Sequence, residues 1–406
     1  MFEWSEEDLM VRDALRAFID KEIRPNVEEL ETGALPPYDI TRKLLSAFGV
    51  DAMAKEGLEK ELAAEAAGEK SSGGGGGMAN SMFLILNMEL AGVSLGLVAS
   101  MGVSMGLTVS TIRGKGTLAQ KKRWLPELVT MEKVGAWAIT EPDSGSDALG
   151  GMKTTVKRDG DDYILKGQKT FITNGPYADT IVVFAKLDEG DDTPIRDRKV
   201  LSFVLDKGMP GLTQGKSFKK MGMMSSPTGE LFFDDVRVGK DRLLGETEDT
   251  GSDSRGSEGA KAGFTAERVG IAALSLGIIN EAQRLSIDYA RSRTLWGQEI
   301  GQFQLIQLKL AEMEIARINV QNMLFSAIER TKAGKPLSLP EASAMKLYSS
   351  RAATEVAMEA VQLFGGNGYM AEYRVEQLAR DAKSLMIYAG SNEIQVTHVA
   401  KGLLRA

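Results

Sequence analysis

Hydrophobic and polar positions follow a helical spacing at the start of the chain. Apolar residues recur there every three or four positions, which is the spacing of one face of an α-helix. Ser5 and Asp8 form a short-armed capping box, so we expect the first helix to begin at this point and to cover residues 5–32. The helical pattern returns over residues 55–70 and 78–131.

The spacing changes to a β pattern from residue 134 to residue 246. Short runs rich in β-branched and aromatic residues alternate there with turn residues such as Asn174 and Gly175. Their regular spacing predicts a small antiparallel barrel or sandwich. The predicted strands include residues 163–165, 181–185, 200–205 and 230–233.

From residue 264 onward the pattern is again strongly helical. A polar stretch rich in Gly and Ser precedes it at 247–262 and predicts a loop. One long helix is expected to end at Gly334, and a second to cover residues 340–364 and to end at the glycine-rich turn that begins with Gly365. The first of these helices presents an apolar face made of Leu310, Met313, Ala316, Val320, Leu324 and Ala327.

The three parts together predict an α+β multidomain fold. We expect a helical domain over residues 1–133, a β domain over 134–246 and a helical bundle over 247–406. The glycine run 73–77 inside the first domain is interpreted as a flexible linker. A phosphate-binding loop is disfavoured there because no Lys-Ser or Lys-Thr pair follows at the required spacing.

Composition narrows the classes of function. The 406 residues are 43% hydrophobic and 26% charged, as in an ordinary soluble protein, and the net charge of −7 argues against nucleic acid as a partner. The chain has no cysteine and a single histidine, His398, so neither a His-based catalytic triad nor a metal site is expected. An acidic N-terminus without a signal or transit peptide, and the lack of a long apolar run, predict a cytoplasmic protein without stable membrane insertion.

Two stretches in the β region carry the candidate chemistry. Residues 137–147 and 169–175 each place an apolar run beside small hydroxyl residues and glycine. The hydroxyls of Thr140 and Thr173 donate hydrogen bonds, and glycine allows the backbone to approach a planar or anionic ligand. Ordinary β-turns are the alternative interpretation, because such turns are common.

With three motifs further along the chain, these stretches resemble the flavin-binding signatures of the acyl-CoA dehydrogenase family. The resemblance covers essentially the whole chain, and the motifs stand in the family's order. It implies an N-terminal helical domain, a middle β domain, a C-terminal four-helix bundle, FAD as cofactor and a homotetramer. It also implies that FAD is held by Trp137, Ile139, Thr140, Gly145, Ser146, Phe171, Ile172, Thr173, Arg293, Gln304, Gln362, Leu363, Gly365, Gly366, Ser391, Asn392 and Glu393.

Two of these residues, Arg293 and Gln304, resemble positions that reach the FAD of a neighbouring subunit. A helix-surface salt bridge is the alternative for Arg293, and a plain helix cap is the alternative for the turn at Gly365. The sequence departs from the usual family pattern at Phe171, where Trp is common, and at Trp296, where Phe is common.

The resemblance also concerns the base that removes a proton from the substrate. The loop position that carries the catalytic Glu in many members is Ala389 here, and Ala cannot accept a proton. Glu267 occupies the helix position that carries the base in isovaleryl-type and long-chain-type members. The alternative is that Glu267 is a first-turn residue favoured by the helix dipole or paired with Arg268. Ser146, Arg268, Ala389 and Gly390 resemble substrate-contacting positions.

The favoured function is FAD-dependent dehydrogenation of an acyl-CoA thioester to the trans-2-enoyl-CoA, with electrons passed to an electron-transfer flavoprotein. An acyl-CoA oxidase or a nitroalkane oxidase is one alternative. A catalytically silent subunit of a hetero-oligomer is the other, and the retained motifs argue against it.

Overall fold

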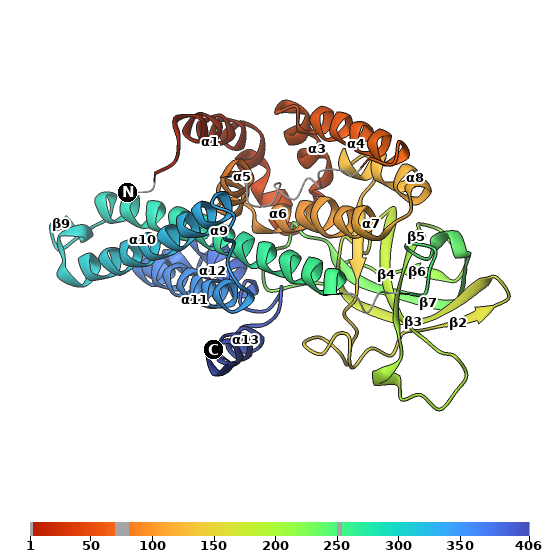
Figure 1. The fold of residues 1–406 in the computed structure, drawn as a ribbon. Helices are drawn as coiled ribbons and strands as arrows, with labels where there is room; N and C mark the ends of the chain where they lie inside the picture. The colour runs from red at the N-terminus through yellow and green to blue at the C-terminus, as the bar shows by residue number, and fades with distance from the viewer. Residues whose placement is uncertain (1–2, 70–80, 250–253, 406) are drawn as a thin grey trace.

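The computed structural model describes residues 3–69, 81–249 and 254–405, with side chains throughout except over 254–264. The β domain lies at one end of the molecule and the C-terminal helices at the other, with the N-terminal helices along one side (Figure 1). The predicted linker at 73–77 falls outside the described residues. The α+β arrangement of helical, β and helical parts is confirmed.

The first helix begins as predicted but ends early. In α1 (Glu6–Phe18), the backbone N–H of Asp8 donates to Ser5 Oγ at 3.1 Å and completes the capping box. The predicted single helix over 5–32 is wrong, because Pro25 lacks an N–H and its ring clashes with the preceding turn. The chain passes instead through a π-turn and a 3₁₀-turn. These elements are η1 (Ile19–Ile23), η2 (Arg24–Asn26) and α2 (Val27–Thr32).

The rest of the N-terminal domain contains one continuous apolar segment. Leu95–Lys115 has a mean hydropathy of 1.6 and is long enough to cross a membrane, but 56% of its apolar window is buried inside the protein. Ser104 in this segment accepts a hydrogen bond from the backbone of Gly135 at 2.8 Å. The segment Leu95–Lys115 therefore lies in the core of the protein, beside the sheet. The helices are α3 (Tyr38–Ala47), α4 (Val50–Ala66), α5 (Ser81–Ala91), α6 (Leu95–Met101), η4 (Gly102–Thr108), α7 (Val109–Lys115) and α8 (Leu118–Val129).

The β domain is one seven-stranded sheet with a mixed pairing pattern. Its order is β1-β4-β2-β3-β7-β6, with β5 on β4. The four predicted strands are present, but β1 and β2 pair in parallel with β4, which the antiparallel prediction did not include. The elements are β1 (Gly135–Ala138), β2 (Thr155–Asp159), β3 (Asp162–Thr173), β4 (Thr180–Leu187), η5 (Ile195–Asp197), β5 (Val200–Asp206), β6 (Leu212–Gln214), β7 (Thr228–Val238) and η6 (Lys240–Arg242).

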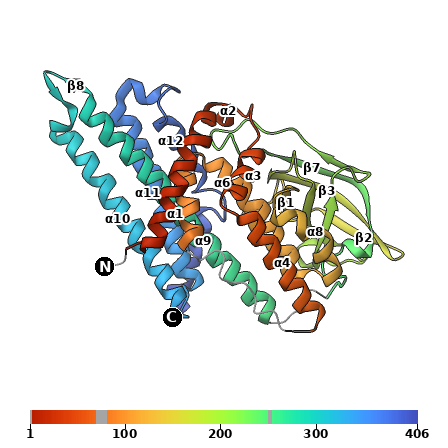
Figure 2. The ribbon, with the colours of Figure 1, turned by 90° about the horizontal axis from the view of Figure 1, so that it is seen from above.

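The C-terminal helices pack around α9 (Ser254–Ser292), which runs from the β domain to the far end of the molecule (Figures 1 and 2). The predicted loop at 247–262 is wrong over 254–262, because α9 already begins at Ser254. A helix tolerates Gly at about 1 kcal/mol each. The other elements are β8 (Thr294–Leu295), β9 (Gln298–Glu299), η7 (Ile300–Gln302), α10 (Gln304–Lys332), α11 (Leu339–Phe364), η8 (Gly365–Tyr369), α12 (Val375–Ser384) and α13 (Asn392–Arg405).

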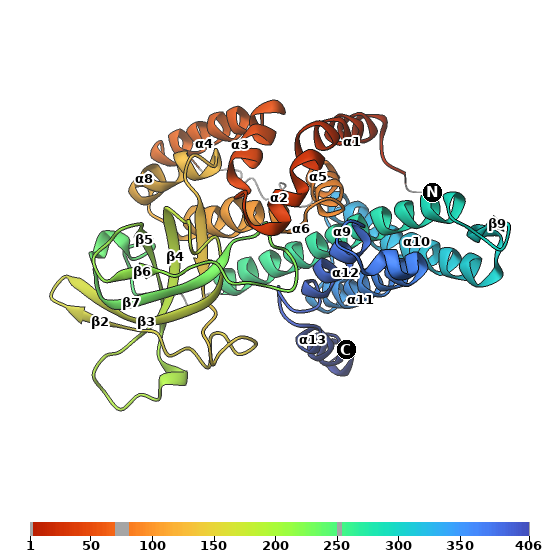
Figure 3. The same cartoon turned by 180° about the vertical axis from the view of Figure 1, so that it is seen from behind.

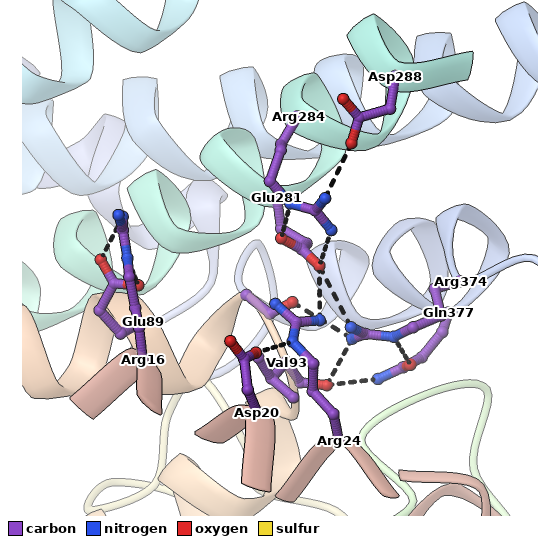
Figure 4. A network of polar contacts seen from close by, with 11 residues as sticks. Arg16, Asp20, Arg24, Glu89, Val93, Glu281, Arg284, Asp288, Arg374 and Gln377 are labelled. Atoms are coloured by element: carbon purple, nitrogen blue, oxygen red, sulfur yellow. Dashed lines mark hydrogen bonds and ion pairs between the residues drawn. The ribbon is translucent and has the colours of Figure 1, made fainter. Parts of the chain in front are cut away.

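A charged network ties the N-terminal helices to this bundle (Figure 4). The buried carboxylate of Glu281 on α9 accepts from Arg24 at 2.9 Å, from Arg284 at 2.9 and 3.0 Å, and from Arg374 at 3.3 Å. Arg374 also donates to the carbonyl of Val93 at 2.7 Å. One carboxylate therefore joins segments from three parts of the sequence.

Candidate active site

Most residues expected to bind FAD lie in two groups at opposite ends of the molecule, and the remaining three, Ser391, Asn392 and Glu393, lie in a third group at the start of α13. Thr140, Phe171 and Thr173 belong to the β domain, whereas Arg293 and Gln304 lie beside the β8–β9 hairpin at the tip of the bundle (Figures 1 and 3). At about 1.5 Å per residue, the part of α9 beyond Glu267 alone is roughly 38 Å long. The two groups of one chain therefore do not form a single site.

In the β-domain group, a bulge turns Phe171 outward. The pairing of β3 with β7 shifts register between Lys169 and Ile172, and Phe171 has a φ of +56°. Phe171 is consequently 66% exposed, while Ile172 points into the core of the sheet. Only the backbone of Ile172 remains for a ligand. Thr173 ends the strand with a partly exposed side chain.

A buried ion pair that the sequence reasoning missed supports this group. Lys169 donates to Glu141 at 2.8 Å and to the carbonyl of Ile139 at 3.0 Å. Burial lowers the pKa of Lys169 to about 8, although Glu141 raises it. The carbonyl of Thr140 accepts from the N–H of Thr170 at 2.9 Å. The turn after β1 is thereby fixed to β3. No local signal marks this pair, because the neighbours of Lys169 in β3 are polar or glycine and Glu141 lies 28 residues away in the sequence.

Trp137 packs within the chain. Its indole N–H donates to Thr111 Oγ1 of α7 at 3.0 Å, and its ring contacts Phe184 edge-on at 4.9 Å. Gly145 and Ser146 are exposed in the loop that follows β1. The hydroxyl of Ser146 is therefore placed at a surface that a ligand can reach, whereas the indole of Trp137 has a partner inside the protein.

In the bundle-end group, the backbone of the glycine turn is open. Gly365 has a φ of +62°, and a methyl group on Gly365 or Gly366 would meet no atom within 4 Å. Gln362 is exposed beside the turn, and Leu363 is buried beneath it. Tyr289 stacks on Phe364 at 4.0 Å and joins this turn to the end of α9.

Arg293 and Gln304 are both exposed at the same end of the bundle. The backbone N–H of Arg293 donates to the carbonyl of Tyr289 at the end of α9, and the carbonyl of Arg293 accepts from the N–H of Ile300. Within the described chain its guanidinium forms no ion pair, so the salt-bridge alternative finds no support there. The charge of Arg293 is available to an anionic ligand.

The third group contains the candidate base. Glu267 is partly buried on α9, and burial raises its pKa, although Arg268 and Lys346 each lower it. Arg268 is buried and donates to Ser343 Oγ on α11 at 2.9 Å. One helical turn from Glu267, a methyl group on Gly270 would meet no atom of the described residues within 4 Å. A carboxylate of raised pKa beside open space has the properties of a general base.

The loop before α13 completes this group. Ala389 and Gly390 both have left-handed backbones, with φ of +55° and +80°. Asn392 is buried and its side-chain oxygen accepts from Lys346 at 3.0 Å, so this oxygen is occupied inside the protein. Ser391 is partly exposed and Glu393 is exposed. Lys346, wholly buried beneath the loop, was missed because a lysine inside a long helix usually faces solvent.

Comparison with known proteins identifies the family. The N-terminal, middle and C-terminal domain models of acyl-CoA dehydrogenase match residues 5–132, 136–236 and 254–404. An acyl-CoA dehydrogenase from Bacillus subtilis (strain 168) is 35% identical over 401 residues, which cover 98% of each chain. The structure of butyryl-CoA dehydrogenase from Megasphaera elsdenii superposes with a TM-score of 0.81 at 32% identity and covers 100% of both chains.

A third relative carries the reduced cofactor. It is a glutaryl-CoA dehydrogenase from Mycobacterium smegmatis in complex with FADH2, with a TM-score of 0.81, 26% identity, and coverage of 99% of this chain and 96% of that one. The fold and the three groups of residues therefore define a flavin-dependent oxidoreductase. The chain belongs to the acyl-CoA dehydrogenase family, uses FAD and acts on acyl-CoA.

The residues present fit FAD. The open backbone at Gly365 and Gly366 admits a ligand at close range, and the guanidinium of Arg293, which pairs with no carboxylate in the described part of the chain, suits a pyrophosphate. The exposed ring of Phe171 and the hydroxyl of Thr173 suit the flat flavin ring. Bound FAD would supply the acceptor for a hydride.

Proposed function

We propose that this protein removes the α-proton of an acyl-CoA thioester with Glu267 and forms the trans-2-enoyl-CoA. The observation that carries the proposal is the pairing of a carboxylate of raised pKa on α9 with Ala389 at the loop position that carries Glu in many relatives. A raised pKa makes a carboxylate a better proton acceptor near neutral pH.

Each residue of the group has a defined task in this proposal. The α C–H bond breaks and its proton moves to the Glu267 carboxylate, while the β-hydrogen leaves as a hydride and the Cα=Cβ bond forms. The N–H of Ala389 donates to the thioester oxygen, where negative charge develops. Arg268 is held by Ser343 one position from the base and contributes positive charge near an anionic substrate.

Replacing the base tests the mechanism. Glu267→Gln should bind FAD and acyl-CoA normally but reduce the flavin at least about 100-fold more slowly, since a general base contributes about that much. The matched control is Glu59→Gln, an exposed carboxylate on α4. Near-native flavin reduction by Glu267→Gln in stopped-flow bleaching would show that another group is the base.

We further propose that the protein is a homotetramer. Arg293 lies at the opposite end of the molecule from Phe171, so each FAD needs groups from two chains. Apolar side chains also stand exposed on and beside α10, including Trp296 at 88% and Leu305 at 75%. Light scattering should give the mass of four chains; a stable, active monomer would contradict this.

The electron acceptor in this proposal is an electron-transfer flavoprotein, and the location is cytoplasmic. Support for the acceptor comes from a solved structure described under the name of an electron-transferring flavoprotein of Acidaminococcus fermentans, which is 33% identical to this chain and superposes with a TM-score of 0.81. Purified enzyme should reduce an electron-transfer flavoprotein faster than it forms peroxide from oxygen. Dominant peroxide formation would favour the oxidase alternative.

A further inference from the structure

Lys346 on α11 is wholly buried directly beneath the substrate loop. Its ammonium donates to the carbonyl of Gly390 at 2.9 Å and to Asn392 Oδ1 at 3.0 Å. Ser350, one turn further along α11, donates to the same Asn392 oxygen at 3.1 Å. A buried ammonium is costly unless it is hydrogen-bonded, and here one bond goes to the loop and the other to the first residue of α13.

The loop needs such support because of its backbone. Ala389 and Gly390 are consecutive residues in the left-handed region, and for a residue with a Cβ this costs about 1–2 kcal/mol. The carbonyl of Gly390 accepts from Lys346 and also from Gln395 at 2.8 Å. Both donors act on the peptide group that follows Gly390, and Gln395 also donates to the carbonyl of Ala389 at 3.3 Å. They therefore hold the strained segment whose N–H we assign to the thioester oxygen.

Lys346 also lies where α11 meets the part of α9 that carries the base. Ser343, three residues before Lys346 on α11, accepts at 2.9 Å from Arg268, the neighbour of Glu267. The charged and titratable groups that act on Glu267 are Arg268 on α9, Lys346 on α11 and Tyr388 in the loop before α13. Those that act on Lys346 are Arg268, Glu267 and Glu393. Burial lowers the pKa of Lys346 to about 8, so the ammonium is charged at neutral pH and opposes the effect of burial on Glu267.

We propose that Lys346 is a positioning residue that both orients the Ala389–Gly390 loop toward the thioester and keeps Glu267 ionised as the base. The inference rests on the proposed function of Glu267 and adds a second, buried charge to it. In this proposal the ammonium of Lys346 does not contact the substrate. It acts through the loop that it holds and through its electric field at Glu267.

The test compares Lys346→Met, which keeps the volume, with Lys346→Gln, which keeps an N–H donor without the charge. Both are measured in the FAD-loaded enzyme by flavin reduction as a function of pH. Loss of a nearby cation raises the pKa of Glu267, so the acidic limb should move upward by about one pH unit, and the rate on that limb should fall roughly ten-fold. Only Lys346→Met should also lose rate on the alkaline plateau.

The matched control is Lys401→Met, an exposed lysine on α13. It should leave the profile, the FAD content and the melting temperature unchanged. Reduced stability with an unmoved acidic limb in Lys346→Gln would overturn the inference and leave Lys346 a structural residue. Lys346→Gln decides the case if Lys346→Met does not fold. Loss of activity in Glu267→Gln with no shift in either lysine variant refutes this inference alone, whereas an active Glu267→Gln refutes the proposed base.

Discussion

At the residue scale, the backbone is strained where ligands are expected. Phe171 and Ala389 both have left-handed conformations, which side chains with a Cβ rarely adopt. One exposes an aromatic ring at the predicted flavin site and the other shapes the predicted thioester loop. Strain of this kind persists only when the surrounding contacts fix it, as Lys346 and Gln395 do for Ala389.

The base itself should lower stability at alkaline pH. Because burial raises the pKa of Glu267, the folded protein binds that proton more tightly than the unfolded chain does. Its contribution is therefore fully present below the ordinary pKa and is lost as the pH rises through the raised value. Glu267→Gln should be more stable than wild type by roughly 1 kcal/mol at alkaline pH, with little difference in acid.

Thermal unfolding of both proteins across this pH range measures the difference. Glu59→Gln, whose parent carboxylate is exposed, should show no such trend. A stability gap between Glu267→Gln and wild type that does not depend on pH would mean that the raised pKa plays no part in stability.

At the element scale, hydrophobic spacing predicted the long helices well and the details of pairing poorly. The predicted ends of α11 lie close to the observed ones because its apolar face repeats without interruption and a glycine turn stops it. The π-turn after α1, the bulge at Phe171 and the parallel pairing of β1 with β4 depend on contacts between distant segments. Local patterns carry no information on such contacts.

In the candidate site too, local motifs were predicted and contacts between distant segments were not. Glu267, the loop at Ala389 and the glycine turn at Gly365 were predicted because each resembles a motif. The supporting lysines, Lys169 and Lys346, were missed because nothing local shows that a lysine is buried. Their partners come from other elements and become visible only in three dimensions.

The open face of α9 yields a prediction at this scale. Gly270→Ala should stabilise the helix by about 1 kcal/mol, because none of the atoms that the structure describes obstructs the added methyl group. If the acyl group lies in that space beside Glu267, the same change should lower kcat/KM for acyl-CoA by about ten-fold. FAD content should stay unchanged.

The control is Gly57→Ala, an exposed helical glycine on α4 that is equally unobstructed. It should give a similar gain in melting temperature with full activity. Equal activity of Gly270→Ala and Gly57→Ala would place the acyl group elsewhere.

At the scale of the whole molecule, the network of Figure 4 should carry much of the stability between domains. Although burial opposes ionisation, the hydrogen bonds from Arg284 and Arg24 lower the pKa of Glu281 to about 2. Glu281→Gln removes the one buried carboxylate that the partly exposed Arg24, Arg284 and Arg374 share, and should reduce the free energy of unfolding by roughly 1–3 kcal/mol at neutral pH.

The contribution of Glu281 to stability depends on pH with the opposite sign to the contribution of Glu267. The stabilisation by Glu281 is present above the ordinary pKa of a glutamate and is lost as the pH falls toward 2. The gap between wild type and Glu281→Gln in thermal unfolding should therefore narrow in acid. Asp288→Asn, which removes an exposed partner of Arg284 only, should cost far less.

The separation of the two FAD-binding groups along α9 leads to a prediction about assembly. If each site takes the β domain of one chain and the bundle end of another, a defect in either group should be rescued by a chain that is defective in the other. Arg293→Ala damages the bundle end, and Thr173→Val damages the β domain. Each variant alone should lose FAD or activity.

Expressed together with distinguishable tags, the two variants should form mixed pairs in which one site combines both undamaged groups. Random pairing makes about half of the pairs mixed, so about a quarter of all sites should regain FAD and activity. Tandem affinity purification isolates the mixed assemblies, and flavin absorbance with single-turnover reduction counts their sites. Separately purified variants, combined without exchange of chains, provide the control. If each chain built its own site, mixed assemblies would be as defective as their parents, because no single chain would carry both undamaged groups.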